Sequence, residues 1–257
     1  MVENDIKRIK ENPFFIKNIE NPSEDLIIEA VNKNGLAIKY IKNPSNLVKE
    51  YAIRNNPLVI EYIEELDEEN SILAVRLLWN SLKYIKNPTE RVKLEAVKTK
   101  GWAIQFIEDP SEEIQLLAVR KDYDSIKYIK NPTLKVQLEA IENYWAAIKF
   151  IDNPSLEVKR AAIRKNEEAI NYIYYDIDEL KILIGDNIKI VKYVFDSITV
   201  DFVVDIVIEK VSQEEIDEKY LIDFLELEIL EMNKINFIRE YGSKKAKMLL
   251  VDYELSR

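Results

Sequence analysis

A pattern of 22 residues recurs along most of this chain. Asn-Pro or Asp-Pro pairs begin at residues 21, 43, 87, 109, 131 and 153, so every interval is 22 residues or twice 22. In the gap, Leu66 stands in place of proline, but Asp67 keeps the next polar position. Seven units therefore run from residue 21 to residue 174. A fixed period in this range predicts a solenoid, in which each unit packs against its neighbours.

Two apolar stripes in each unit predict two helices. Position 10 is always alanine and position 11 is Val or Ile, and with position 6 they share one helical face. Positions 17, 18 and 21 form a second, shorter face. Each unit should contain a helix of about nine residues, a turn and a helix of about seven, both too short to be stable alone in water. The constant alanines, which let helices approach closely, are Ala30, Ala52, Ala74, Ala96, Ala118, Ala140 and Ala162.

Residues that favour helix ends separate the two stripes. Position 3 is Ser, Thr or Asp, which are good N-caps, and acids follow it in the first turn, where the helix dipole favours them. Glycine at 35 and 101 suits the C-terminal break of the first helix. The residue before each proline avoids α geometry, which should end the second helix.

Position 20 is Tyr or Phe in all seven units. We expect these rings to belong to the core between repeats, because an aromatic residue in every unit, both ends included, is what stacking demands. The alternative is a ladder of rings that stacks on a ligand. The residues are Tyr40, Tyr62, Tyr84, Phe106, Tyr128, Phe150 and Tyr172.

The period weakens at both ends of the repeat region. A half-unit at 12–20 precedes it and a degenerate unit at 175–196 follows it, so the predicted solenoid covers 1–196. Residues 197–257 are acidic and lack the period, and we interpret them as a helical C-terminal cap that covers the exposed end of the stack.

Within this predicted cap, three local patterns bear on the helices. Residues 198–208 have helical spacing, but their β-branched content leaves a strand open as the alternative. Ser212 followed by Glu215 is a capping-box pattern that predicts a helix running towards Met232. Gly242 should separate the last two helices.

The unit "NPTERVKLEAVKTKGWAIQFIEDP" at residues 87–110 resembles the leucine-rich variant repeat, with its Asp/Asn-Pro start, its hydrophobic-Ala-Val run and its terminal apolar pair. It is also similar to short helical repeats of bacteria, phages and large viruses. The resemblance covers residues 12–196 and implies a HEAT-like α-solenoid with no catalytic residue. The expected fold is all-α, with seven to nine two-helix repeats and a helical cap.

Few residues are available for chemistry. The chain has no His and no Cys, which excludes Ser–His and Cys–His catalysis and the usual zinc sites. Carboxylate runs at 67–69 and 176–178 coincide with expected helix starts. We therefore expect no enzymatic activity, no metal and no cofactor. The chain has no apolar run near the ~18 residues of a membrane helix and no signal-peptide pattern at its start, so we expect a cytoplasmic protein without a membrane partner.

The candidate binding residues vary between units. Large aromatics occupy the turn at positions 14–16 only in the four middle units, where flanking units carry Gly, Pro or Glu. Such rings are enriched at protein interfaces, and the alternative is that each folds back over its own turn. They are Trp79, Trp102, Tyr123, Tyr144 and Trp145.

Two basic rows accompany these aromatics. The row at position 12 includes Arg76, Lys98 and Arg120, and the row at position 19 includes Lys83 and Lys127. Each row also has a structural interpretation, because cations at a helix C-terminus complement its dipole and lysines on an exposed helix face can simply be solvated.

These features predict a non-catalytic protein-binding solenoid that acts as an adaptor or inhibitor. The resemblance to phage repeats implies action on a host defence protein. Nucleic-acid binding along the basic rows is the alternative, although the near-neutral charge of the repeats argues against it. DNA mimicry by the acidic C-terminal region is a second alternative.

Overall fold

The computed structural model describes residues 2–256, and every regular element in that range is helical. The predicted all-α solenoid is therefore confirmed. The chain divides into two compact units, Met1–Val136 and Gln137–Arg257, which are described separately. The predicted boundary at residue 196 falls within the second unit.

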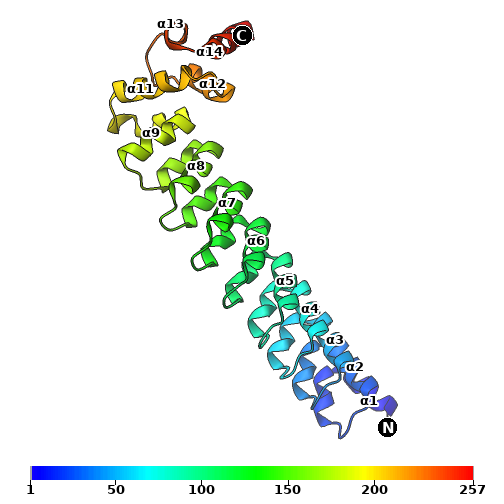
Figure 1. The fold of residues 1–257 in the computed structure, drawn as a ribbon. Coiled ribbons are helices and arrows are strands. Elements are labelled where there is room, and N and C mark those ends of the chain that lie inside the picture. The colour runs from blue at the N-terminus through cyan, green and yellow to red at the C-terminus, as the bar shows by residue number, and fades with distance from the viewer. Residues whose placement is uncertain (1, 257) are drawn as a thin grey trace. The chain divides into compact units, whose positions relative to one another are not determined.

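The first unit stacks pairs of helices, one α-helix and one 3-10 helix to each repeat. In Figure 1 the α-helices form one row and the 3-10 helices a second row beside it. The α-helices are α1 (Val2–Glu11), α2 (Glu24–Lys33), α3 (Asn46–Asn55), α4 (Glu68–Leu77), α5 (Glu90–Thr99), α6 (Glu112–Lys121) and the start of α7 (Leu134–Asn143). The 3-10 helices are η1 (Pro13–Asn18), η2 (Gly35–Tyr40), η3 (Pro57–Tyr62), η4 (Trp79–Tyr84), η5 (Gly101–Phe106) and η6 (Tyr123–Tyr128). The sequence analysis missed α1.

The second helix of each repeat is a 3-10 helix. An asparagine side chain caps η1, η2 and η3, whereas η4, η5 and η6 begin without a side-chain cap. At the start of η2, the side chain of Asn34 accepts a hydrogen bond from the backbone N–H of Leu36 at 3.0 Å, and Asn56 does the same for Leu58 at 3.1 Å. Such turns compete with α-helical geometry, and the backbone continues with bonds between residues three apart. In a 3-10 helix residues i and i+3 lie one above the other, so positions 16 and 19 share one face.

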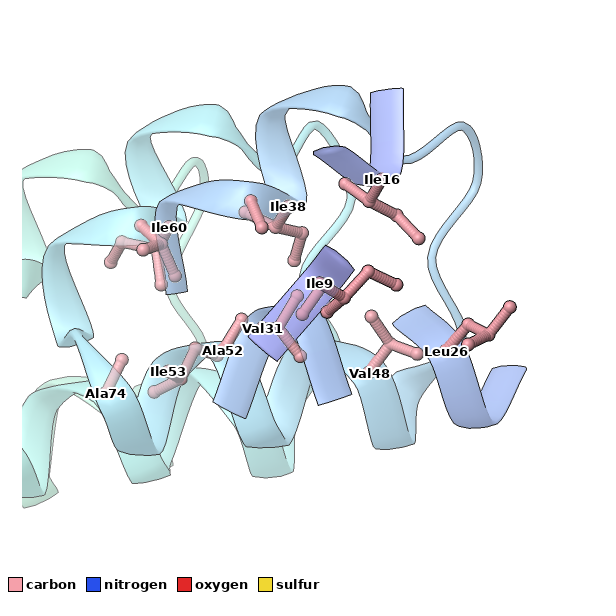
Figure 2. Packing of buried hydrophobic residues seen from close by; sticks show 13 residues of the cluster. Ile9, Ile16, Leu26, Val31, Ile38, Val48, Ala52, Ile53, Ile60 and Ala74 are labelled. Atoms are coloured by element: carbon pink, nitrogen blue, oxygen red, sulfur yellow. The ribbon is translucent and has the colours of Figure 1, made fainter. Parts of the chain in front are cut away.

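The core lies between the two rows. Figure 2 shows Ile38 and Ile60 of the 3-10 row pointing towards Ala52 and Ile53 of the α row. Ala52 and Ile53 are fully buried, and Ile38 is 2% exposed. The predicted alanine column and the apolar positions 11 and 18 are thereby confirmed as core.

The residue before the proline of each Asn-Pro or Asp-Pro pair that opens a repeat has a left-handed backbone, with φ between 48° and 51°. The prediction that this residue avoids right-handed α geometry and that the second helix ends before it is confirmed, but the backbone is left-handed instead of extended. Asn and Asp enter this region most readily, because their short polar side chains can hydrogen-bond locally, which explains why only they precede proline. These residues are Asn21, Asn43, Asn87, Asp109, Asn131 and Asn153. Glu65, at the equivalent position of the irregular repeat, is not among the described residues with positive φ.

Replacing Asn87 with Ala should lower the free energy of unfolding by about 1 kcal/mol, because Ala enters the left-handed region less readily than Asn. Asn87→Gly should be neutral or stabilising. Urea unfolding followed by circular dichroism measures both. Glu65→Ala is the matched control and should have little effect, and an equal loss at Asn87 and Glu65 would contradict the strain argument.

Gly35 and Gly101 lie at the predicted break after the first helix, but for a different reason than expected. Neither has positive φ, so neither forms a left-handed cap. A Cβ at Gly35 would lie 2.7 Å from the carbonyl oxygen of Ala52, and one at Gly101 would lie 2.5 Å from that of Ala118. Glycine is required here because the α-helix of the next repeat approaches so closely.

The N-cap hydroxyls also join neighbouring repeats. Ser111 donates to Glu90 at 3.0 Å and Thr133 donates to Glu112 at 2.9 Å, and in each pair the acid begins the preceding α-helix. The hydrogen bond from Thr133 and the nearby Lys135 hold the pKa of Glu112 below its ordinary value. The first-turn acids therefore link repeats, in addition to their favourable position in the helix dipole.

The second unit continues the pattern and then departs from it. Its repeats comprise the rest of α7, η7 (Trp145–Phe150), α8 (Leu156–Lys165), η8 (Glu167–Tyr172) and α9 (Ile177–Asp186). Then follow η9 (Ile188–Ile190), α10 (Val191–Val194), η10 (Phe195–Ser197), α11 (Val200–Val211), α12 (Glu218–Glu226), α13 (Lys234–Tyr241) and α14 (Lys244–Leu255). Residues 200–208 are thus helix rather than strand.

The capping-box prediction at Ser212 is wrong. Ser212 is the C-cap of α11, with φ −76° and ψ −14°, whereas Asp217 caps α12 and accepts a hydrogen bond from the Lys219 N–H at 2.9 Å. The predicted break at Gly242 is confirmed between α13 and α14.

Candidate partner-binding surface

The position-20 aromatics of the first unit are not core residues. Tyr40 is 47% exposed, Tyr62 43% and Tyr128 36%, while Tyr84 and Phe106 are half-buried. The expectation that these rings fill the space between repeats is therefore wrong for Tyr40, Tyr62 and Tyr128, whereas Tyr84 packs against the core. Position 20 is the last residue of each of these 3-10 helices, so its ring lies where the packed face ends.

Lysine ammonium groups lie over two of these rings. The ammonium of Lys39 lies 3.6 Å from the centre of the Tyr62 ring in the next repeat, and that of Lys83 lies 4.5 Å from the centre of the Tyr84 ring. Within residues 2–256, neither lysine forms an ion pair. Cation–π contacts at such exposed sites contribute about 0.5–1 kcal/mol each. The ammonium groups of both lysines therefore stay available to contact another molecule.

Trp102 occupies the centre of a polar cluster. Its indole Nε1 donates to Asp124 of the next repeat at 2.7 Å, and the ammonium groups of Lys100 and Lys127 lie 4.6 and 4.7 Å from its ring centre. Lys127 also pairs with Asp124 at 2.8 Å. Burial raises the pKa of Asp124, but the hydrogen bonds from Lys127 and Trp102 outweigh it and hold that pKa below its ordinary value.

The other predicted aromatics of the first unit are also half-buried. Trp79 stacks on Phe106 of the next repeat with ring centres 5.9 Å apart, and Tyr123 is half-buried at the start of η6. Trp79 and Trp102 therefore contact side chains of the following repeat. Each ring is neither fully exposed nor packed only over its own turn.

We name the resulting set the aromatic–lysine surface. It lies on η2 to η6 of the first unit and consists of Lys39, Tyr40, Tyr62, Lys83, Tyr84, Trp102, Phe106, Lys127 and Tyr128.

A hollow of about 300 Å³ interrupts this surface where the Asn-Pro pair is missing. It is lined by Tyr62 and Tyr84 together with Leu66 and Lys86. The sequence analysis noted the missing pair but did not expect a cavity there. A hollow between two aromatic rings has the shape that receives an anchoring side chain at an interface.

The position-12 row is largely neutralised. Arg76 and Lys98 both pair with Glu95, at 2.8 and 2.9 Å, and hydrogen bonds from the two cations lower the pKa of Glu95. Arg120 is exposed on α6. This arrangement favours the structural interpretation of the row, in which cations at helix ends satisfy nearby carboxylates.

Tyr144 and Trp145 belong to the second unit, so the structure does not bring them together with Trp79 or Trp102. Tyr144 is 46% exposed. Trp145 is half-buried, and its ring centre lies 6.4 Å from that of Tyr172. The ammonium of Lys149 lies 5.2 Å from the ring centre of Trp145 and 4.1 Å from that of Tyr172. The second unit thus repeats, on a smaller scale, the lysine and aromatic arrangement of the first.

Among residues 2–256, no group of three or more acidic side chains could hold a metal ion. No helix in the same range is both long and apolar enough to cross a membrane. The aromatic–lysine surface can contact another molecule through its rings, its ammonium groups and one hollow.

Comparisons with protein-family models, with curated proteins and with solved structures give no match to this chain. The resemblance to leucine-rich variant and HEAT-like repeats therefore stays a prediction.

Proposed function

We propose that this chain is a non-catalytic binding protein whose aromatic–lysine surface takes an acidic patch of a partner protein. The single observation that carries the proposal is the exposure of the position-20 rings, because a repeat core does not require Tyr40 and Tyr62 to remain more than two-fifths exposed. Either an adaptor or an inhibitor would act by holding its partner at this surface.

Charge supports an acidic partner. Lys39 and Lys83 extend over rings and have no carboxylate partner among the described side chains. An approaching carboxylate would gain a charge-assisted hydrogen bond without displacing an existing ion pair. The position-12 cations are less suitable, because Glu95 already compensates Arg76 and Lys98.

The hollow between Tyr62 and Tyr84 supports a folded or peptide partner. Binding energy at protein interfaces is concentrated where a large side chain enters a pocket rimmed by polar groups. Here the pocket has aromatic walls, and Glu61, Glu64 and Lys86 lie at its edge.

Single-stranded nucleic acid is the second candidate, since rings that stack on bases and lysines that contact phosphates are its usual binding elements. The formal net charge of −10 opposes it more strongly than it opposes an acidic patch on a protein, because a nucleic acid carries negative charge along its whole length. We therefore favour a protein.

The test is affinity capture from a lysate of the organism that encodes the chain, with and without nuclease. Lys39→Glu with Lys83→Glu alters the surface, and Arg54→Glu with Lys98→Glu is the matched control on the α row, with the same change in charge. We expect one protein in near-equimolar amount on the wild type and the control, and a loss of about tenfold or more on the surface variant.

Two results would contradict this proposal in different ways. Loss of all captured material after nuclease treatment would favour nucleic acid instead. Equal capture by the wild type and the surface variant would place the binding site elsewhere on the chain.

A further inference from the structure

Another cavity lies within the second unit. It measures about 210 Å³ and is lined by Arg164 of α8, Asp186 at the end of α9, Lys210 of α11 and Tyr220 of α12. One water occupies about 30 Å³ in the liquid, so the cavity has room for a small molecule. Residues of α8, α9, α11 and α12 line it, so it forms where four helices meet.

Tyr220 is the unusual residue of this cavity. Its side chain is 4% exposed, and its hydroxyl has no hydrogen-bond partner among the described residues. Leaving a buried polar group without a partner is unfavourable, and buried hydroxyls are nearly always paired. Burial, and then the charge of Asp186, raise the pKa of the Tyr220 phenol, so it remains a neutral hydrogen-bond donor at physiological pH.

The three carboxylates that line the cavity already have partners. Asp186 accepts from Arg160 at 2.5 and 3.0 Å and from Arg164 at 2.8 Å, so one carboxylate holds two guanidinium groups. Asp223 pairs with Lys219 at 2.7 Å, and Asp217 caps α12. Their negative charge is thus already matched by neighbouring cations or by the helix start.

Lys210 is the lining cation that remains. Its ammonium lies 5.6 Å from the centre of the Tyr220 ring, and within residues 2–256 it forms no ion pair. A neutral donor and a positive donor are therefore both left without an acceptor at one cavity, while the cavity's own acceptors are in use.

We propose that this cavity binds a small oxyanion, a carboxylate or a phosphate group, which accepts hydrogen bonds from the Tyr220 hydroxyl and the Lys210 ammonium. Charge-assisted hydrogen bonds of this kind are among the stronger polar contacts in proteins. The bound oxyanion also gives the buried Tyr220 hydroxyl the hydrogen-bond partner that it otherwise lacks. The site lies on the second unit, so it is separate from the proposed partner surface on the first.

The experiment uses the full chain and compares sodium phosphate and sodium acetate with sodium chloride at equal ionic strength. Phosphate binding is followed by phosphorus NMR titration, acetate binding by titration calorimetry, and stability by the thermal unfolding midpoint. We expect at least one of the two anions to bind saturably and to raise the midpoint with concentration, as a ligand of the native state does. The anion that acts identifies the source of the oxyanion.

Tyr220→Phe separates binding from folding. In chloride its midpoint should equal or exceed that of the wild type, because the unpartnered hydroxyl is gone. Its dissociation constant for the active anion should rise about tenfold or more, and Lys210→Gln should have the same effect on binding. Lys181→Gln, an exposed lysine of α9 that pairs with Glu209, is the control and should bind as the wild type does.

Three results would overturn the proposal. The first is that neither anion binds the wild type more tightly than chloride does. The second is that Tyr220→Phe retains full affinity for the anion. The third is that Tyr220→Phe is less stable than the wild type in chloride. The last result would mean that an internal water already satisfies the hydroxyl.

Discussion

Asp186→Ala should lower the free energy of unfolding by roughly 2–3 kcal/mol, because Arg160 and Arg164 lose their shared carboxylate. The Asp186 side chain is 8% exposed, whereas the two arginines are 39% and 54% exposed and can return to water. That exposure keeps the expected loss below the largest values known for buried pairs. Chemical unfolding of the full chain, followed by circular dichroism, measures the difference.

Glu209→Ala is the matched control in the same unit. Glu209 pairs with Lys181 at 3.0 Å, but both side chains are at least half exposed, so its removal should cost less than about 1 kcal/mol. Comparable losses at the two positions would mean that the Asp186 cluster contributes no more than a surface ion pair.

The contribution of Asp186 should also depend on pH. Burial raises its pKa, but the hydrogen bonds from Arg160 and Arg164 outweigh burial and hold the pKa below its ordinary value. A carboxylate with a depressed pKa stabilises the fold above its unfolded pKa of about 3.9, and the stabilisation is lost as pH falls through the folded pKa. The stability difference between wild type and Asp186→Asn should therefore be constant near pH 7 and shrink below about pH 4.

Ala162→Leu should destabilise the chain by about 1–3 kcal/mol, because the larger side chain overfills a fully packed site. Ala162 lies in α8 with no exposed surface. The thermal midpoint and the urea midpoint of the full chain both measure this effect.

Ala161→Leu provides the adjacent control in the same helix. Ala161 is half-buried, and Leu and Ala have similar helix propensities, so this variant should stay within about 0.5 kcal/mol of the wild type. If both variants were equally stable, the alanine column would not be a site of close helix packing.

The repeat architecture was predictable because its causes are local and periodic. A fixed spacing of capping residues, apolar stripes and Asn-Pro pairs determines where each helix begins, ends and faces. The alanine column was identified correctly for this reason, and so was the break at Gly242. Backbone conformation was harder to predict, since a six-residue 3-10 helix and a short α-helix place similar apolar positions inward.

The candidate surface was predicted only in part. Tyr40 and Tyr62 end their 3-10 helices and remain exposed, which the apolar pattern alone did not indicate. The positions of Lys83 and Lys127 were anticipated from their row, but their contacts with rings depend on that geometry. The Tyr220 cavity carries no sequence signal, because it forms where helices of irregular spacing meet.

The hydrogen bonds between first-turn glutamates and N-cap hydroxyls join only adjacent repeats, as Glu90 with Ser111 and Glu112 with Thr133 show. Removal of residues 87–108 would bring Ser111 to the place of Thr89, opposite Glu68, with the same chemistry. Gene duplication or deletion of whole 22-residue segments can therefore lengthen or shorten such a chain without inventing a new junction. The length of such a stack can therefore change in steps of one repeat.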